Sequence, residues 1–137
     1  MTSQSTTKSA VTEFPPADPS QAKAHFDSLL AYETDCWDVH HALETGEPDF
    51  VLLDVRSPEC FRKGHVPGAV NLPHGKLVER NLQQYPPETL FVVYCTGTHC
   101  NGADKGARRL ASLGRYVKKM IGGIEGWKED GFSLTSE

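Results

Sequence analysis

The chain has 137 residues, of which 38% are hydrophobic, and its formal net charge is -4. This length supports one compact domain with a core and is short for two ordinary domains. Charged residues form no acidic or basic blocks, so we expect neither a nucleic-acid partner nor a membrane-surface partner. No apolar run approaches the roughly 20 residues that span a bilayer. Residues 1–16 lack the apolar region of a secretory signal, so we expect a cytoplasmic protein.

The N-terminal part of the chain divides into a tail and a helix. Residues 1–17 are rich in Ser, Thr, Lys and Pro, and they predict a flexible tail because they cannot bury enough apolar surface. Asp18 can cap a helix that begins at Pro19. One face of this amphipathic helix carries Ala22, Phe26, Leu29 and Leu30, which we expect to pack on the domain. The prediction is a single domain over residues 18–137 with an extra N-terminal helix.

Alternating helices and apolar runs follow. A short helix is predicted after Thr34 or Asp35 and ends at Gly46, with Val39, Ala42 and Leu43 facing inward. Three apolar runs predict strands at residues 50–53, 90–94 and 116–121. The first two are continuous, as in strands that are covered on both faces. Helical or turn-rich segments separate the runs, which indicates a parallel sheet with helices on both sides.

The helix after Tyr94 is the clearest in the sequence. Its predicted apolar face carries Ala103, Ala107, Leu110 and Ala111, and Gly114 ends it. Its polar face includes Lys105, Arg108 and Arg109, which we interpret as a solvated surface. Lys105 is also near enough to the helix start to meet an anion.

The chemistry is expected at Cys95, which directly follows a predicted buried strand. Ligands bind at this edge of open α/β sheets. Gly97 and Gly102 would let the loop turn its N–H groups toward one point, where the next helix adds its positive end. We therefore predict a lowered pKa for the Cys95 thiol, and a thiolate that attacks sulfane sulfur. The alternative is a buried small hydrophobic residue that ends a strand. The residues expected to bind substrate are Thr96, Gly97, Thr98, His99, Cys100, Asn101 and Gly102.

Three segments of the chain resemble the rhodanese-like domain family. They are LLDVRSPECFRKGHVPGAVNLP, VVYCTGTHCNGA and IGGIEGW, and the resemblance covers about residues 34–134. It implies an α/β fold with a five-stranded, mostly parallel sheet and helices on both faces. It also implies a sulfurtransferase that moves a sulfane sulfur from thiosulfate or a persulfide to a thiophilic acceptor through a Cys95 persulfide. The donor and acceptor would be small molecules or proteins, and no cofactor or oligomeric state is implied.

The first of these segments has a mainly structural interpretation. Ser57 and Pro58 suit the cap and first position of a short helix, and Gly64 suits its left-handed end. Pro67 and Gly68 suit a turn before the next strand.

Four side chains in or near these segments are expected to support the fold. Asp54 could act as an acid or base, but its position favours fixing loop amides. Arg56 could meet an anionic substrate, and an internal ion pair is the favoured role. We expect His65 to be a buried, hydrogen-bonded imidazole and Trp127 a core residue.

The active-site loop departs from the family pattern. It is longer by one or two residues, and Gly102 stands where an Arg often does. Without that fixed charge, a dianion such as thiosulfate is held less well. Cys100 has two open interpretations, because spacing alone does not place its side chain. It is either a resolving cysteine that closes a reversible disulfide with Cys95, or a packing residue on the back of the loop.

For the remaining cysteines and for His99, we weigh structural or solvated roles against chemical ones. A domain of this size needs no disulfide framework, so we expect reduced thiols and treat Cys36 and Cys60 as structural. His99 is either a local cation that supports the thiolate or a solvated loop residue. A zinc site of Cys95, His99 and Cys100 would lack a fourth ligand, so no metal is expected.

Two other functions compete with sulfur transfer. A cysteine-based phosphatase or arsenate reductase would need an Arg six residues after Cys95, where Asn101 stands. A catalytically silent binding module of the same fold is the other alternative, and the presence of Cys95 at the first loop position argues against it.

Overall fold

The computed structural model describes residues 9–137, and the chain divides into a first unit, Met1–Leu30, and a second, Ala31–Glu137. The predicted N-terminal helix is α1, Pro19–Tyr32, and the Asp18 carboxylate accepts a hydrogen bond from the Ser20 N–H at 3.1 Å. Helix α1 has no buried residue, and the packing that we predict for its apolar face stays a prediction. Part of the predicted tail, residues 1–8, lies outside the described residues. The rest of it is exposed, and its flexibility is untested.

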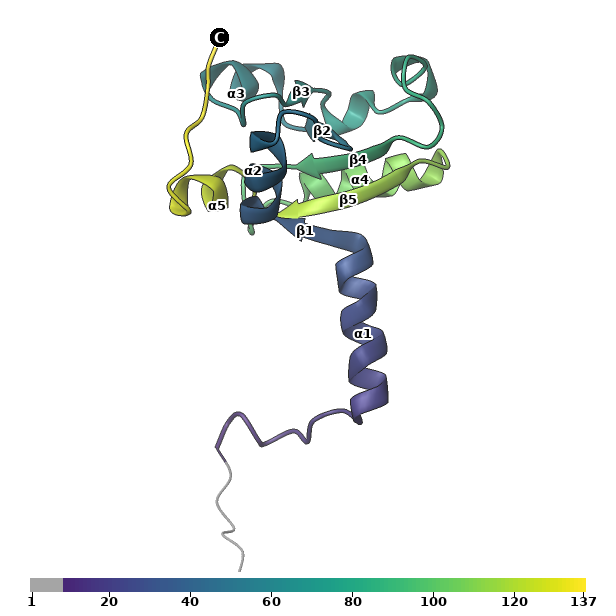
Figure 1. Cartoon of the computed structure of the whole chain (residues 1–137), viewed down its shortest axis with the longest axis vertical. Coiled ribbons are helices and arrows are strands. Elements are labelled where there is room, and N and C mark those ends of the chain that lie inside the picture. The colour runs from purple at the N-terminus through teal and green to yellow at the C-terminus, as the bar shows by residue number, and fades with distance from the viewer. Residues whose placement is uncertain (1–8) are drawn as a thin grey trace, which may run out of the picture. The chain divides into compact units, whose positions relative to one another are not determined.

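The second unit contains a five-stranded sheet in which every pair of neighbours is parallel (Figure 1). The strand order is β1-β5-β4-β2-β3. The strands are β1 (Glu33–Asp35), β2 (Val51–Asp54), β3 (Val70–Asn71), β4 (Leu90–Tyr94) and β5 (Tyr116–Ile121). The predicted parallel sheet is therefore confirmed. Strands β1 and β3 have three residues and two residues, which is too short for a periodic signal in the sequence.

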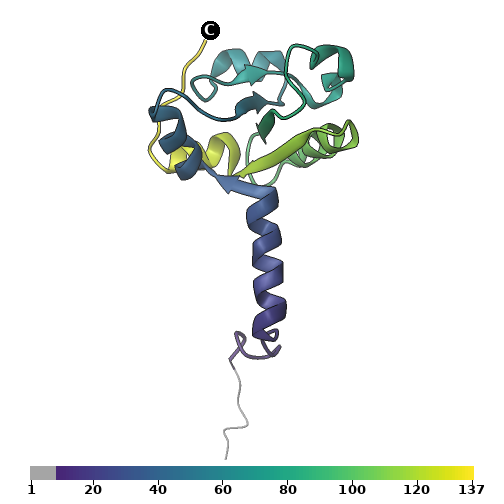
Figure 2. The same ribbon diagram turned by 45° about the vertical axis from the view of Figure 1, so that its right-hand side comes forward.

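Helices cover both faces of this sheet (Figures 1 and 2). They are α2 (Cys36–Glu44), α3 (Pro58–Lys63), α4 (Gly102–Ser112) and α5 (Gly123–Glu129), with short 3-10 helices η1 (His74–Lys76) and η2 (Glu79–Asn81). Helices α2 and α5 lie on one face, and α4 lies on the other with η1 beside it. The predicted α/β architecture is thus confirmed.

Two hydrophobic cores follow from the alternation of side chains along the strands. Along β4, Val92 and Tyr94 point into the core under α2 and α5, whereas Phe91 and Val93 point into the core under α4. Cys95 continues this alternation and belongs to the α4 core. The strand therefore sends neighbouring side chains, Tyr94 and Cys95, to opposite faces of the sheet.

Several predicted helix and turn signals are present as hydrogen bonds. The Asp35 side chain accepts from the Asp38 N–H at 2.8 Å at the start of α2, and Ser57 accepts from the Cys60 N–H at 3.2 Å at the start of α3. The Ala69 N–H donates to the Val66 carbonyl at 3.0 Å across the predicted turn. Gly68 in that turn has φ +89°, which favours glycine.

Two local predictions are wrong. Gly64 ends α3 with φ 170°, so its backbone is extended and not left-handed. In α4, Ala111 is exposed and Gly106 takes the buried position, packed against Val55 and Leu77. The prediction chose Ala111 in place of Gly106 because glycine carries no hydrophobic signal.

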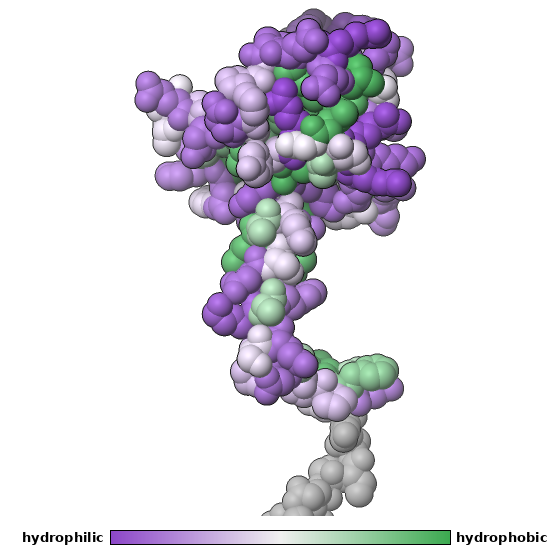
Figure 3. All heavy atoms as spheres, turned by 90° about the vertical axis from the view of Figure 1, so that its right-hand side faces the viewer, coloured by the Kyte–Doolittle hydropathy of each residue, from purple (hydrophilic) through white to green (hydrophobic). Residues whose placement is uncertain are grey.

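The edge of the sheet at which the strands begin faces the viewer in Figure 3, where hydrophilic side chains surround a strip of hydrophobic ones. No helix within residues 9–137 is long and apolar enough to cross a membrane.

Candidate active site

Cys95 lies where we expect it, directly after β4 at the carboxyl edge of the parallel sheet. Its side chain is buried, with 7% of its surface exposed, and it borders a cavity of about 200 Å³. The cavity is also lined by loop residues Gly97, Thr98 and Cys100, by Ala103 of α4 and by Gly123 of α5. The loop thus encloses a small space around the sulfur.

Helix α5 holds the first half of this loop in place. The Ile124 N–H donates to the Cys95 carbonyl at 3.1 Å, and the Glu125 N–H donates to the Thr96 carbonyl at 2.8 Å. Gly123 has φ +58°, and a Cβ at this position would collide with the Cys95 carbonyl oxygen. The start of α5 can therefore approach the loop backbone only with glycine at position 123, a requirement that we did not derive from the sequence. Two adjacent glycines before a helix were the available signal.

Cys100 meets Cys95 in the structure, and the two form a disulfide with their Sγ atoms 2.50 Å apart. Their Cα atoms are 6.6 Å apart, within the range of about 4.4 to 6.8 Å that a disulfide spans. The Cys100 N–H donates to the Gly97 carbonyl at 3.1 Å, so the loop curls back on itself. The interpretation of Cys100 as a packing residue on the back of the loop is therefore wrong. The expectation of reduced thiols stays a prediction for this pair, and Cys36 and Cys60 are free.

The first residue of α4 touches both sulfurs. The Gly102 N–H donates to the Cys100 Sγ at 3.4 Å. A Cβ on Gly102 would lie 2.8 Å from the Cys95 Sγ, which is closer than real Cβ contacts allow. Glycine at position 102 therefore lets the start of α4 approach the sulfur pair.

The two thiols differ in acidity when the disulfide is reduced. Burial, followed by the hydrogen bond with Cys100, raises the pKa of Cys95. The hydrogen bond with Cys95 lowers the pKa of Cys100, and the Gly102 N–H and the charge of Lys105 act in the same direction. The predicted lowering of the Cys95 pKa is therefore wrong, because desolvation outweighs the loop donors. Cys100 is therefore the more acidic thiol of the reduced pair.

The other predicted loop residues occupy different surroundings. Thr96 lies beside the sulfur, and its N–H and hydroxyl oppose the rise in the Cys95 pKa. His99 is exposed and lines a separate pocket with Glu125 and Lys128, so it does not border the sulfur cavity. Asn101 is exposed and its side chain does not cap α4.

Lys119 of β5 lines the sulfur cavity, and the sequence interpretation missed it. Its ammonium group lies 3.0 Å from the Asp104 carboxylate and 3.8 Å from that of Glu33. A lysine in the middle of an apolar strand was the available signal. Both neighbouring carboxylates offset its charge, so it does not present a free cation to the cavity.

Asp54 and Arg56 form the internal ion pair that we predict for Arg56. The Arg56 Nη2 lies 2.7 Å from the Asp54 Oδ2, and the Arg56 backbone N–H donates to Oδ1 at 3.0 Å. The Tyr94 hydroxyl donates to the same carboxylate at 2.7 Å and accepts from the Val66 N–H at 3.1 Å. Burial, followed by the charge of Asp54, raises the pKa of Tyr94. None of these residues lines the sulfur cavity, so the network fixes the strand ends rather than the reacting atoms.

His65 and Trp127 are core residues. The His65 Nδ1 lies 2.7 Å from the Phe61 carbonyl oxygen, which assigns the proton to Nδ1. The Trp127 Nε1–H donates to the Ser133 carbonyl at 2.9 Å. Cys36 is buried in the core, whereas Cys60 is exposed on α3, so burial does not support a structural role for Cys60. In the part of the chain that the structure describes, no three His, Cys, Asp or Glu side chains form a metal-binding group.

Comparison with known proteins identifies the family. The family model for the rhodanese-like domain matches residues 38–130. The HTH-type transcriptional regulator Rv0324 of Mycobacterium tuberculosis is 36% identical over 91 residues, which cover 66% of this chain and 39% of that protein. The adenylyltransferase and sulfurtransferase UBA4 of Meyerozyma guilliermondii is 31% identical over 97 residues, which cover 65% of this chain and 22% of that protein. The chain thus spans well under half the length of these relatives.

Solved structures share the fold. The BH2092 protein of Bacillus halodurans superposes with a TM-score of 0.84 and 34% identity over 87% of both chains. Thiosulfate sulfurtransferase of Pseudomonas aeruginosa superposes with a TM-score of 0.65 and 22% identity over 85% of this chain and 21% of that one, a likeness of fold alone. With the family model matched over most of its length, the chain belongs to the rhodanese-like domain family.

Proposed function

We propose that the protein is a sulfurtransferase that carries a sulfane sulfur as a persulfide on Cys95. The observation that carries the proposal is the position of the Cys95 sulfur, which borders a small cavity at the carboxyl edge of the sheet and meets the start of α4. Hydrogen bonds from α5 hold the backbone of Cys95 and Thr96. Membership of the rhodanese-like family supports the same chemistry.

The first step transfers sulfur to Cys95. In the reduced pair, the Cys100 thiolate accepts the Cys95 proton while the Cys95 Sγ forms a bond to the terminal sulfur of the donor. The sulfur–sulfur bond of the donor breaks, and its electron pair leaves with the inner sulfur, as a thiolate from a persulfide or as sulfite from thiosulfate. In the second step, a thiophilic acceptor attacks the terminal sulfur of the Cys95 persulfide and restores the Cys95 thiolate.

The cavity favours a persulfide as donor over thiosulfate. Its volume of about 200 Å³ is below the range of about 300 to 1,000 Å³ that is typical of small-molecule sites, so a donor enters by its sulfur end. Lys119 is the cation that lines this cavity within residues 9–137, and the carboxylates of Asp104 and Glu33 offset its charge. The lining of this cavity therefore offers a thiosulfate dianion no unpaired cation, whereas a persulfide needs less charge compensation.

Cys100 provides a second route by which the outer sulfur of the persulfide is released. The Cys100 thiolate attacks the Cys95 Sγ, expels the outer sulfur as hydrosulfide and closes the Cys95–Cys100 disulfide. An external dithiol then reduces this disulfide and returns both thiols. The direct contact between the two sulfurs supports this step.

Mass spectrometry of the reduced protein tests the proposal. In the Cys100→Ser background, where Cys100 does not resolve the persulfide, we expect incubation with glutathione persulfide to add one sulfur mass to the peptide that contains Cys95, and thiosulfate to load it more slowly. Cys95→Ser removes this product and the transfer of sulfur to a thiol. Cys60→Ser is the matched control because it removes an exposed cysteine far along the chain from the loop and should load normally. Full transfer by Cys95→Ser, or no adduct with any donor, contradicts the proposal, and the second result favours a silent binding module.

Thiol counting tests the exit through Cys100. After loading without a reductant, we expect the wild type to lose two free thiols and to release one sulfide per chain. Cys100→Ser should keep a stable persulfide and release none. Equal sulfide release by both proteins excludes the resolving role and leaves the Cys95 persulfide untouched.

A further inference from the structure

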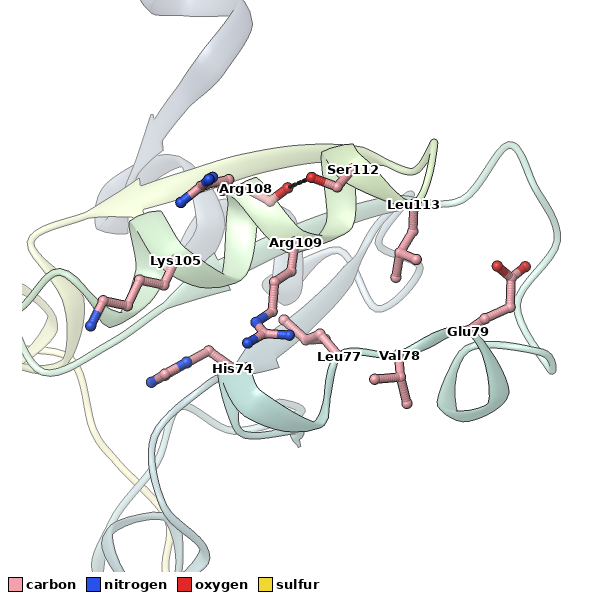
Figure 4. Close-up of a pocket in the computed structure, with 9 residues that line it drawn as sticks. All are labelled: His74, Leu77, Val78, Glu79, Lys105, Arg108, Arg109, Ser112 and Leu113. Carbon is pink, nitrogen blue, oxygen red and sulfur yellow. Dashed lines mark hydrogen bonds between the residues drawn. The ribbon is translucent and has the colours of Figure 1, made fainter.

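A second and larger cavity lies beside the sulfur site, between α4 and the segment that begins at η1. It measures about 700 Å³. Helix α4 contributes Lys105, Arg108 and Arg109 to it, and His74 and Leu77 line the opposite side (Figure 4). We call this cavity the α4 groove.

Within the described part of the chain, Lys105, Arg108 and Arg109 of the α4 groove have no carboxylate partners. Among the ion pairs of residues 9–137, none includes Lys105, Arg108 or Arg109, although Lys23, Arg56 and Lys119 are all paired elsewhere. Lys105 lies three residues before Arg108 and four before Arg109, and like charges at these spacings on one helix repel each other. The chain as a whole has a net charge of -4, so this group is a local positive region on a negative protein. An anionic partner would offset the repulsion.

The charge of the groove lining differs between its two ends. Lys105 and His74 extend toward one end of it, and the Arg109 guanidinium lies between α4 and η1 (Figure 4). Glu79 is the acidic residue of the lining, and it lies at the other end (Figure 4). Leu77 and Val78 give the stretch between these ends an apolar wall.

The cationic end of the groove adjoins the sulfur site. Lys105 is three residues after Gly102, whose N–H donates to the Cys100 Sγ. The positive charge of Lys105 also lowers the pKa of the Cys100 thiol. The cationic end of the groove is therefore the end nearer to the start of α4, where Gly102 meets Cys100.

The chemistry of the lining selects the occupant. Small phosphate-like anions are held by converging backbone N–H groups at helix ends, but the groove residues of α4 lie inside the helix, where those groups are already bonded. The donors here are long side chains spread along an open surface, next to apolar side chains. Such a surface suits a peptide segment with several carboxylates and an apolar residue, because charge pairs fix its register while the apolar contact adds burial.

We propose that the α4 groove docks an acidic segment of the protein that exchanges sulfur or electrons with the Cys95–Cys100 pair. The proposal rests on the sulfurtransferase function above and specifies a class of partner for it. Docking brings the partner's cysteine to the cavity that Cys95 borders, and the uncompensated charges of α4 give the encounter its specificity.

The test uses a fluorescein-labelled peptide of glutamates and leucine that ends in cysteine, and a matched peptide with glutamine in place of glutamate. We expect the wild type to bind the acidic peptide in fluorescence anisotropy, and high salt to weaken the binding. The variant R108E/R109E should bind it at least about tenfold more weakly. The control variant R62E/K63E carries the same change of charge on exposed residues of α3, outside the groove, and should bind normally.

Sulfur transfer separates docking from chemistry. With the acidic peptide as acceptor, R108E/R109E should raise KM by at least about tenfold and leave kcat unchanged, while transfer to mercaptoethanol stays at the wild-type rate. Equal binding of the glutamine peptide, or equal binding by R108E/R109E, overturns the docking proposal even if Cys95 forms a persulfide. Peptide binding without persulfide formation instead overturns the proposed function. Self-association of the wild type that R108E/R109E abolishes, with no peptide binding, assigns the groove to a second copy of the chain and also overturns the proposal.

Discussion

Gly102→Ala probes the contact between the start of α4 and the reacting sulfur. The added Cβ would lie 2.8 Å from the Cys95 Sγ, and non-bonded atoms settle at about 3.5 to 4.0 Å, so the sulfur or the helix must move by about 0.7 Å or more. A displacement of about 1 Å at a reacting atom can lower a rate by about 100-fold. We therefore expect the rate at which Cys95 forms a persulfide to fall by about 10- to 100-fold.

The same substitution should have a small effect on stability. Alanine is favoured over glycine inside a helix by up to about 1 kcal/mol, and local crowding costs about 1 to 3 kcal/mol, so the free energy of unfolding falls by no more than about 3 kcal/mol. Single-turnover loading followed by mass spectrometry gives the rate, and urea denaturation gives the stability. Gly75→Ala is the control, because no atom lies within 4 Å of the Cβ that it adds. A loading rate for Gly102→Ala within about twofold of the wild type refutes the steric reasoning.

Three further predictions address the buried network and the cysteines. Asp54→Asn removes the charge that faces buried Arg56, so we expect the free energy of unfolding in urea to fall by about 3 to 5 kcal/mol. Tyr94→Phe removes one hydrogen bond to Asp54 and should lower it by about 1 to 3 kcal/mol. A loss below about 1 kcal/mol in both variants contradicts a stabilising role of the network. In the reduced protein near neutral pH, iodoacetamide should modify Cys100 before Cys95, because the pKa of Cys100 is lowered and that of Cys95 is raised. Peptide mapping by mass spectrometry measures the order of modification. Faster modification of Cys95 would make Cys95 the more acidic thiol and contradict this prediction. Burial raises the pKa of Cys36 from 9.0 to about 11, so the folded state favours the neutral thiol, and the resulting stability is present below pH 9.0 and is lost as the pH rises to about 11. Thermal unfolding across this window should show a smaller loss in Cys36→Ala, and identical slopes for the two proteins contradict the burial argument.

The fold was predictable where the sequence carries long or paired local signals. The continuous apolar runs of β2 and β4 and the caps at Asp35 and Ser57 are local features that tertiary packing does not override. The short strand β1 was missed, and β3 was indicated only as a strand after the turn at Pro67 and Gly68, because pairing with neighbours far along the chain defines both strands. The conformation of Gly64 was mispredicted for a similar reason, since the Leu134 side chain packs beside it from the C-terminal segment.

The site was predictable in its location and less so in its electrostatics. The position of Cys95 after a buried strand is a consequence of chain order, so the sequence indicated it directly. The side of the loop on which Cys100 lies depends on how the chain curls between Gly97 and Gly102, which no periodic pattern encodes. The direction of the Cys95 pKa depends on the balance between desolvation and loop donors, and only the burial of the sulfur determines this balance.

The hydrogen bonds from α5 divide the active-site loop into two parts with different freedom. Ile124 and Glu125 tether the carbonyls of Cys95 and Thr96 to a helix, whereas the Cys100 N–H is bonded only to Gly97 within the loop itself. The backbone of Cys95 is thus anchored to a helix outside the loop, whereas the backbone of Cys100 is anchored to the loop alone. A substitution in α5 should therefore disturb the position of Cys95 before that of Cys100.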